Sequence, residues 1–428
     1  MDRLRSLTAQ LTASRARSDE LFDLVIPDAV YDRPIPERNR IIFYLGHLDA
    51  FDWNLICQHT FEMDSFNREF DRLFAFGIDP TDGNLPQDRP GDWPSVAEIR
   101  RYDQRVREKV DECLKRSSKE HQLMFHVAIE HRMMHEETLA YMLHNLPLNQ
   151  KRLRPEMHRP LTQPVTHSQV EIPAGPVSMG LSPSEQTPFG WDNEFNEHQE
   201  HVDGFSIDVY NVTNGQFLEF IQAGGYEDRA LWPDADWNWI QSTNSKCPVF
   251  WSQRNDRWFL RLMFDEIELP MSWPVYVSHA EASAYASWRG KSLPSEAQYH
   301  RAAFGSRDRH NRMYPWGDDA PMPHHGNFDF VQWSPTHVNA HPRGSSAFGV
   351  ADLMSNGWEW TSTLFQPFPG FEAFQFYKGY SADFFDGKHY VLKGASPRTA
   401  ATLIRRSFRN FFQAHFPVIY ATFRCVGD

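Results

Sequence analysis

The stretch that decides the N-terminal half of the chain is His126-Val-Ala-Ile-Glu-His131-Arg-Met-Met-His135-Glu-Glu137-Thr-Leu-Ala-Tyr-Met-Leu. Good helix formers dominate it and neither Pro nor Gly interrupts it, so it predicts one helix. His131 and His135 are four residues apart, which puts both imidazoles on one face, one turn apart. This spacing lets a helix offer two ligands to one metal ion, although such a pair also occurs as a plain polar face. Glu137 projects from another side, so it is a candidate to orient a ligand rather than to be the third ligand.

Working outward, the sequence predicts three more helices before this one, at residues 3–25, 37–64 and 95–115. Ser95 followed by Glu98 forms a capping box at the start of the third. A loop rich in Gly, Pro and Asp, residues 77–94, precedes it. Four helices with apolar stripes predict a four-helix bundle, in which sites are built from side chains that face one another in the core.

The second predicted helix contributes a third histidine. His47 lies there among aromatic and aliphatic neighbours, and alone it is best explained as a buried structural residue. In a bundle that also holds His131 and His135, it becomes the natural third imidazole. The remaining histidines of this half are interpreted as mostly structural: His59, His121, His126 and His144.

Composition limits the protein's class and partners. The chain has 428 residues, 41% hydrophobic and 23% charged, which is ordinary for a globular protein of two or three domains. Its net charge of −13 argues against nucleic acid and anionic membranes as partners. The four cysteines are scattered without a CxxC pair, which disfavours a disulfide framework and fits a cytoplasmic location. We expect no signal peptide and no membrane span.

The composition and pattern of the sequence change after a polar linker. Residues 146–170 are rich in Pro and Arg, and beyond them the chain consists of short strands, turns and loops with many Trp, Gly and Asn residues. Helical patches begin at Thr213 and Ser278. We therefore predict an α+β protein of two domains, a helical bundle at 1–160 and a second domain at 161–428.

The second half resembles the formylglycine-generating-enzyme and sulfatase-modifying-factor superfamily, whose implied fold is a C-type-lectin-like domain. The matching segments, in chain order, are Ile172-Pro-Ala-Gly-Pro-Val-Ser-Met-Gly180, Val209-Tyr-Asn-Val-Thr-Asn-Gly-Gln-Phe217, Pro274-Val-Tyr-Val-Ser278, Trp288-Arg-Gly-Lys-Ser-Leu-Pro-Ser-Glu-Ala-Gln-Tyr299, Tyr314-Pro-Trp-Gly317 and Phe348-Gly-Val-Ala-Asp-Leu-Met-Ser-Asn-Gly-Trp-Glu-Trp360. Formylglycine-generating enzymes use a pair of cysteines near the C-terminus, and only Cys425 is present here. The resemblance therefore does not imply that activity.

The first half resembles the DinB-like bundle, and the two halves together resemble the ergothioneine sulfoxide synthase and selenoneine synthase family. These are non-haem iron enzymes that use O2 to join a sulfur or selenium donor to the imidazole C2 of hercynine. The resemblance implies that His47, from a Gly-His pair, and His131 and His135 bind Fe(II), with Glu137 as their orienting partner. Imidazole suits Fe(II), and three neutral ligands leave positions open for O2, the donor and the substrate.

The segment Ser407-Phe-Arg409-Asn410-Phe411-Phe412-Gln413 matches a family motif that lines the substrate pocket in the second domain. By resemblance, Asn410 would bind the hercynine carboxylate. Phe411 would face the trimethylammonium group, a contact worth ~0.5–2 kcal/mol. Arg409, Phe412 and Met134 are the other predicted substrate-binding residues. The alternative is that these phenylalanines simply pack the core.

Departures from the family pattern predict the donor. Phe412 stands where members that use γ-glutamylcysteine have Asp, and Met134 stands where Gln is expected. The arginine clamp for that donor is replaced by Arg100-Arg-Tyr102-Asp103. These changes favour a donor with less negative charge, and we expect a selenosugar, as in a selenoneine synthase.

Cysteine, as in an ergothioneine sulfoxide synthase, is the alternative donor, although the tyrosine pair of the cysteine-using subgroup is not evident at Leu73-Phe74-Ala-Phe76. Phenylalanines, at Phe365 and Phe368, stand where a catalytic tyrosine is often found. No proton donor is assigned, and the candidates are Tyr102, Tyr377, Tyr380 and Tyr420. A lectin-like binding protein without catalysis is the alternative from another class, and iron content with O2 uptake would separate the two.

Overall fold

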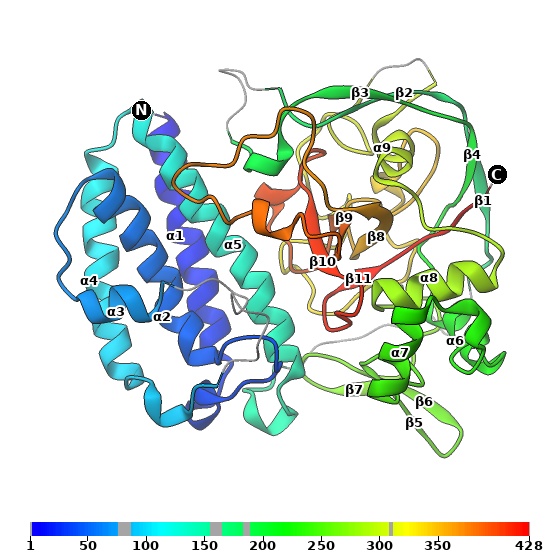
Figure 1. Cartoon of the computed structure of the whole chain (residues 1–428), viewed down its shortest axis with the longest axis horizontal. Coiled ribbons are helices and arrows are strands. Elements are labelled where there is room, and N and C mark those ends of the chain that lie inside the picture. Colours follow the sequence, from blue (N-terminus) through cyan, green and yellow to red (C-terminus); the bar gives the residue numbers. More distant parts are fainter. Residues whose placement is uncertain (1, 76–86, 155–164, 183–188, 308–310, 428) are drawn as a thin grey trace. The chain divides into compact units, whose positions relative to one another are not determined.

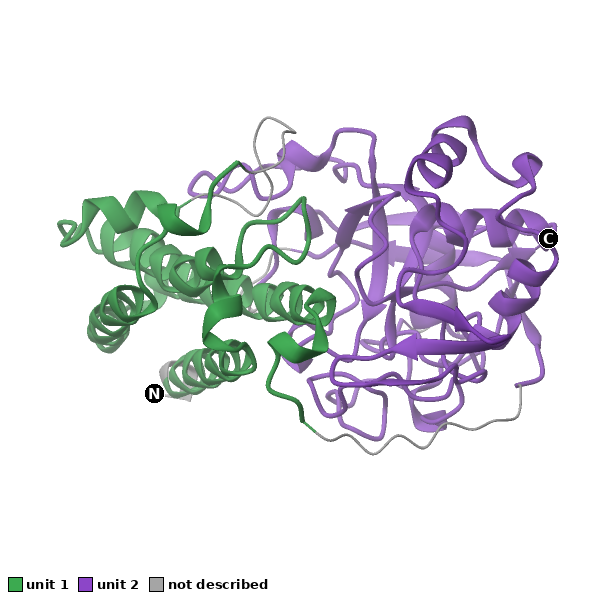
Figure 2. Ribbon diagram, turned by 90° about the horizontal axis from the view of Figure 1, so that it is seen from below, with its two compact units in different colours: residues 1–155 green, residues 156–428 purple. Residues whose placement is uncertain are grey.

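The computed structural model describes residues 2–75, 87–154, 165–182, 189–307 and 311–427. The chain divides into two compact units, residues 1–155 and 156–428 (Figure 2). The expected boundary at residue 160 falls outside the described residues. Each unit is described by itself below.

Four long helices form the first unit (Figure 1): α1 (Asp2–Asp23), α2 (Ile41–Asp52), α4 (Val96–Lys115) and α5 (Gln122–Asn145). α5 packs against α1 and α2, and α4 packs against α2 and α1, so the predicted four-helix bundle is confirmed. Between them lie a 3₁₀ turn (Pro27–Tyr31), α3 (Arg68–Leu73) and further 3₁₀ turns at Pro90–Asp92 and Lys119–His121, and a last 3₁₀ turn, Leu148–Gln150, follows α5. No helix in the described part of the chain is long and apolar enough to cross a membrane.

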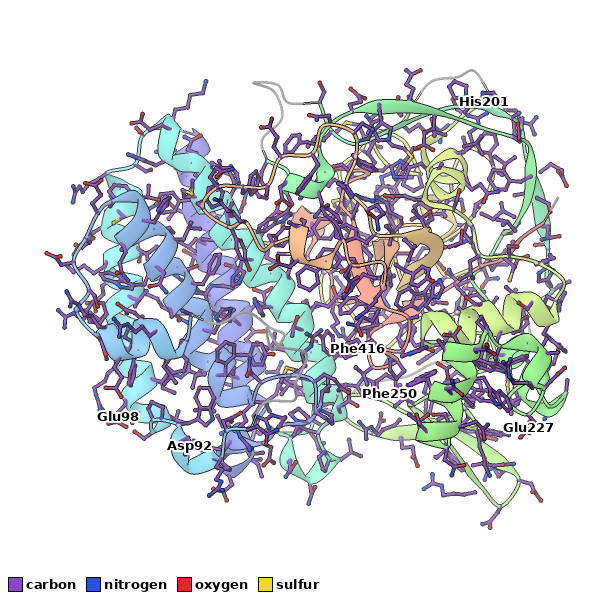
Figure 3. The ribbon with its side chains drawn as sticks, in the orientation of Figure 1. Asp92, Glu98, His201, Glu227, Phe250 and Phe416 are labelled. Carbon is purple, nitrogen blue, oxygen red and sulfur yellow. The ribbon has the colours of Figure 1, made fainter. Side chains whose placement is uncertain are left out.

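The ends of the helices test the local predictions. α4 begins after Ser95, whose hydroxyl accepts from the Glu98 amide at 3.3 Å, while the Glu98 carboxylate accepts from the Ser95 amide at 2.9 Å. The predicted capping box is therefore confirmed, and Figure 3 labels Glu98 at this end of α4. The predicted second helix, 37–64, is shorter, because Arg40 is extended and α2 begins at Ile41. α2 continues without a break into a π-helical segment, Trp53–Thr60.

The second unit is built on short strands. Its largest sheet has the order β10-β9-β8-β11, with bounds Asn410–Gln413, His389–Ala395, Gly357–Leu364 and Ala421–Thr422, and only the β8–β11 pair is parallel. A second sheet has the order β1-β4-β12, with bounds Gln169–Ile172, Phe205–Asp208 and Val426–Gly427. β4 pairs with both β1 and β12, so the beginning and the end of the unit meet in one sheet.

Two smaller sheets complete the strands. β2 (Gly175–Met179) pairs with β3 (His198–Val202), and β5 (Trp251–Arg254), β6 (Arg257–Arg261) and β7 (Glu266–Glu268) form an antiparallel meander. The α-helices are α6 (Asn214–Gln222), α7 (Asp234–Thr243), α8 (His279–Trp288) and α9 (Glu296–Phe304). The 3₁₀ turns are Asp192–Glu194, Arg229–Leu231, Pro342–Gly344, Ala382–Phe384 and Ala401–Leu403. This mixture of helices and strands confirms the predicted α+β class.

A buried ion pair holds the centre of the second unit. The Arg424 guanidinium donates to both carboxylate oxygens of Glu359 on β8, at 2.6 and 2.7 Å, and both side chains are fully buried. The same guanidinium donates to the carbonyls of Asp208, Val209 and Ala351. Because one side chain satisfies several backbone acceptors, loops with little regular structure can pack around the largest sheet.

Candidate metal centre and substrate residues

The bundle brings three imidazoles together in its interior. His47 comes from α2, and His131 and His135 come from successive turns of α5. The Nε2 atoms of His131 and His135 are 3.1 Å apart, and one ligand nitrogen from each of the three residues lies within 4.8 Å of the others. All three side chains are buried. Among the described residues, this is the one cluster of His, Cys, Asp or Glu side chains with the geometry to hold a metal ion.

A backbone carbonyl orients the His47 ring. The Nδ1 atom of His47 lies 2.6 Å from the carbonyl oxygen of Phe74, and because a carbonyl only accepts, Nδ1 must carry the hydrogen. Nε2 then presents its lone pair to the cluster, and it is buried without a hydrogen-bond partner among the described residues. Contacts of this kind fix the tautomer of metal-binding histidines.

Burial keeps the three imidazoles neutral. It lowers the pKa of His47 to about 4. It also lowers the pKa of His131 and of His135 well below the usual range, and charge on the neighbouring histidines lowers both further. Neutral imidazole is the form that binds a metal, so no proton has to leave at neutral pH.

Aromatic rings pack against the cluster of three histidines. Phe51 stacks on His131 with 3.5 Å between ring centroids, and Phe43 stacks on His47 at 4.8 Å. Phe43 and Phe51 lie one turn before and one turn after His47 on α2. An apolar wall lowers the local dielectric and limits the access of water.

A buried charge network ties the helices together beside the cluster. The Arg132 guanidinium, next to His131 in sequence, donates to Asp49 at 2.9 Å and to Asp52 at 2.7 Å, and thereby joins α5 to α2. Arg107 on α4 pairs with Asp49 at 3.0 Å and with Asp19 on α1 at 2.7 Å. The helices that carry the imidazoles are therefore fixed against sliding within two residues of the ligands.

The donor set fits a first-row transition metal. It consists of three neutral nitrogens without a thiolate or carboxylate, which suits Fe, Zn, Cu or Ni and leaves coordination positions open. Met134 and Glu137 are half-buried on α5. Their predicted roles, in substrate binding and in orienting a ligand, stay predictions. The orienting contact made by the Phe74 carbonyl was missed, because a backbone atom 27 residues away leaves no signal in the sequence.

One predicted substrate residue is used elsewhere. The Arg409 side chain is buried, and its guanidinium pairs with the Glu296 carboxylate at 3.0 and 3.1 Å. It also donates to the carbonyls of Gln366 and Asn193. These donors are directed into the interior of the second unit, so Arg409 supports the segment that carries Asn410 and Phe411, and its predicted role in substrate binding stays a prediction.

The other predicted residues of the second unit lie on strand β10. Successive side chains of a strand point to opposite sides, so Asn410 and Phe412 share one face and Phe411 and Gln413 share the other. Asn410 and Phe412 are half-buried, and the Phe412 ring stacks on Phe416, which Figure 3 labels. Phe411 is also half-buried, and its ring stacks on Phe365 at 4.1 Å.

The positions that matched the donor clamp are used inside the bundle. Arg100 pairs with Asp19 at 3.2 Å, and the Tyr102 hydroxyl donates to Asp71 at 2.8 Å. Asp103 is buried, and burial together with the charge of Asp49 raises its pKa well above the usual range. Arg100 and Tyr102 thus have partners within the bundle, and Asp103 lies in its interior, so these positions give no evidence about the charge of the donor.

The candidate proton donors are dispersed. Tyr380 stacks on Trp191 at 3.9 Å with Tyr377 beside it, and burial raises the pKa of Tyr377 to about 12. Tyr420 is buried against Tyr276. Phe365 and Phe368, at the positions of the expected catalytic tyrosine, are buried, and Phe76 lies outside the described residues.

Comparisons with known proteins agree with this division of the chain. Residues 156–428 match the sulfatase-modifying factor enzyme 1-like domain, and residues 10–146 match the DinB superfamily. A protein of Mycolicibacterium thermoresistibile named hercynine oxygenase is 34% identical over 78% of this chain and 75% of its own length. A Mycobacterium tuberculosis protein of the same name is 36% identical over 56% of each chain. The ergothioneine biosynthesis protein 1 of Schizosaccharomyces pombe is 27% identical over 95% of this chain and 54% of its own length.

The fold and the histidine cluster thus define a DinB-type bundle joined to a sulfatase-modifying-factor domain. The chain belongs to the hercynine oxygenase family, and it is an enzyme of that family.

Proposed function

We propose that this protein is a non-haem Fe(II) enzyme that uses O2 to form a carbon–chalcogen bond at the imidazole C2 of hercynine. The observation that carries the proposal is the buried cluster of three neutral imidazoles. The names of the relatives point to hercynine as the substrate and, through ergothioneine, to carbon–sulfur bond formation as the reaction class.

The donor set supports iron as the resident metal. His47, His131 and His135 would hold it through three nitrogens, a ligand set that suits Fe(II) and leaves positions open. Bound there, iron would supply the O2-dependent oxidising chemistry. The chain itself keeps the imidazoles neutral by burial and keeps water away with Phe43 and Phe51.

Asn410 and Phe411 are the proposed hercynine residues. The Asn410 side-chain oxygen accepts from the Phe411 amide at 2.9 Å, which leaves its Nδ2 group as a donor for a carboxylate. The Phe411 ring, half-buried and supported by Phe365, offers a face to a trimethylammonium group. The two side chains project from opposite faces of β10, which is at the edge of its sheet, so one substrate would contact both only by lying across that edge.

The donor is proposed to be a selenosugar. Phe412 supports a neutral donor, because it offers an apolar ring stacked on Phe416 where an acid would bind an ammonium group. Arg100 and Asp103 give no support, since Arg100 pairs with Asp19 and Asp103 is buried in the bundle. Cysteine is the second candidate, favoured by the relative named for ergothioneine biosynthesis.

The test is anaerobic loading with Fe(II), then exposure to O2 and hercynine with selenosugar, cysteine or γ-glutamylcysteine offered separately. Products are identified by mass. His131→Ala should lose most of the bound iron and all of the product, whereas His126→Ala on the same helix, outside the cluster, should keep both.

A selenium adduct formed from the sugar alone supports the full proposal. A cysteine adduct keeps the reaction class and replaces the donor. A wild-type protein that binds no iron and takes up no O2 contradicts the proposal and leaves a lectin-like binding protein as the better explanation.

A further inference from the structure

The residue before His47 is a glycine in the interior of a helix. Gly46 lies in the middle of α2, where glycine costs about 1 kcal/mol relative to alanine. A Cβ atom at this position would lie 2.7 Å from two ring carbons of Phe74 and 2.8 Å from a third. The Phe74 ring therefore occupies the space that a side chain at residue 46 would need.

The Phe74 ring cannot readily move away. It is fully buried, stacks on Trp93 at 6.1 Å and meets Phe70 edge-on at 5.6 Å. It follows directly after α3, and α3 is tied to its surroundings through Asp71, which accepts from the Tyr102 hydroxyl at 2.8 Å. A methyl group at residue 46 would push against a ring that is held on its other sides.

The same residue supplies the carbonyl that orients His47. The distance from the Phe74 oxygen to His47 Nδ1 is 2.6 Å, so displacing Phe74 by a few tenths of an ångström would lengthen this hydrogen bond. Without that bond, the imidazole could carry its hydrogen on Nε2, and the lone pair would no longer face the other two histidines.

We propose that Gly46 is a positioning residue of the metal centre, which admits Phe74 against α2 so that the Phe74 carbonyl fixes the tautomer and ring angle of His47. The inference rests on the proposed metal-binding function. It explains why a residue unfavourable to helices stands beside a ligand: the local cost secures a contact to the ligand itself.

The test compares Gly46→Ala, Phe74→Leu and the double variant Gly46→Ala/Phe74→Leu. Affinity is measured by titration with Fe(II) and with Co(II), and the His47 tautomer of the metal-free protein is read by ¹⁵N NMR. Gly91→Ala is the matched control, because a Cβ there meets nothing within 4 Å.

Gly46→Ala should weaken metal binding by about 10–100-fold, the usual effect of losing a contact that orients a ligand, and should shift His47 away from the Nδ1–H tautomer. Leucine is smaller than phenylalanine and the carbonyl belongs to the backbone, so the double variant should recover most of the affinity. Gly91→Ala should bind like wild type.

Wild-type affinity and an unchanged tautomer in Gly46→Ala would overturn the inference. If Gly46→Ala does not fold, the comparison is made between Phe74→Leu and the double variant. Adding Gly46→Ala to Phe74→Leu should change the affinity for metal little. A loss of affinity by about 10–100-fold in that comparison would equally overturn the inference. Failure of the wild-type protein to bind metal would instead count against the proposed function.

Discussion

Replacing Arg132 with methionine should destabilise the helical bundle by about 3–5 kcal/mol, the usual result of removing one partner from a buried ion pair. The guanidinium is buried between two carboxylates, 2.9 Å from Asp49 and 2.7 Å from Asp52, and none of the three side chains is more than 1% exposed. Asp49 keeps Arg107 as a partner, so the loss falls on Asp52. Because the substitution leaves one carboxylate without its cation, and not two, we expect the loss of stability to lie within this range.

The free energy should be measured by hydrogen exchange of peptides from α2 and α5, which reports the opening of the bundle separately from the second unit. Lys109→Ala is the control, because its pair with Glu112 is on the surface of α4, where an ion pair contributes little to stability. Arg132→Met/Asp52→Asn should recover part of the loss, since it removes the stranded charge.

The pH dependence has a definite sign. Burial already raises the pKa of Asp52 in the wild-type protein, and removing the guanidinium should raise it further. The folded variant then binds a proton that the unfolded chain releases, so its stability falls as pH rises above about 4. Arg132→Met should therefore be closer to wild type at pH 5 than at pH 8. A change below 1 kcal/mol at both values would refute the reasoning.

Three further predictions concern the second unit, the substrate and the metal. Burial lowers the pKa of Lys393 from 10.5 to about 8, so between these pH values the unfolded chain holds a proton that the folded state has lost. The cost of burying the ammonium group is therefore relieved, and the free energy of unfolding should rise by about 3 kcal/mol from pH 8 to 10.5 in the wild type but not in Lys393→Met. Parallel stability curves for the two proteins would contradict this prediction. Phe411→Ala should weaken hercynine binding, measured by calorimetry, by about 2–30-fold from the lost cation–π contact, while Phe259→Ala in β6 leaves it unchanged. Metal at 100 times its Kd should raise the free energy of opening that hydrogen exchange reports for α2 and α5 by about 2.7 kcal/mol. A chelator should reverse this effect, and exchange in β8 should not change. Equal protection of β8 would argue against a centre confined to the bundle.

The features that could be predicted from the sequence depend on neighbours along the chain. The capping box of Ser95 and Glu98 spans three residues, and the common face of His131 and His135 spans four. Helix geometry alone fixes both. The four-helix pattern pointed to His47, the change in composition after residue 170 pointed to the α+β organisation, and the resemblance supported both.

The features that the sequence did not show depend on contacts between distant segments. Arg409 fits a pocket motif by sequence, yet its partner is Glu296, 113 residues earlier. Arg100 and Asp103 stand where the family has a donor clamp, and the sequence did not show that Arg100 pairs with Asp19 on α1 or that Asp103 is buried in the bundle. A motif gives the type of a side chain and its register, but not the groups that surround it.

The sequence by itself therefore determined the four long helices and the residue types they carry, because capping, helical spacing and propensity act over a few residues. Only the tertiary structure decided how the centre is held. The Phe74 carbonyl that orients His47, the space at Gly46 that admits Phe74, and the Arg132 pairs that join α5 to α2 all come from separate segments. Burial then acts on the assembled groups, keeping the imidazoles neutral and the charges paired, and burial is a property of the packed fold rather than of any stretch of sequence.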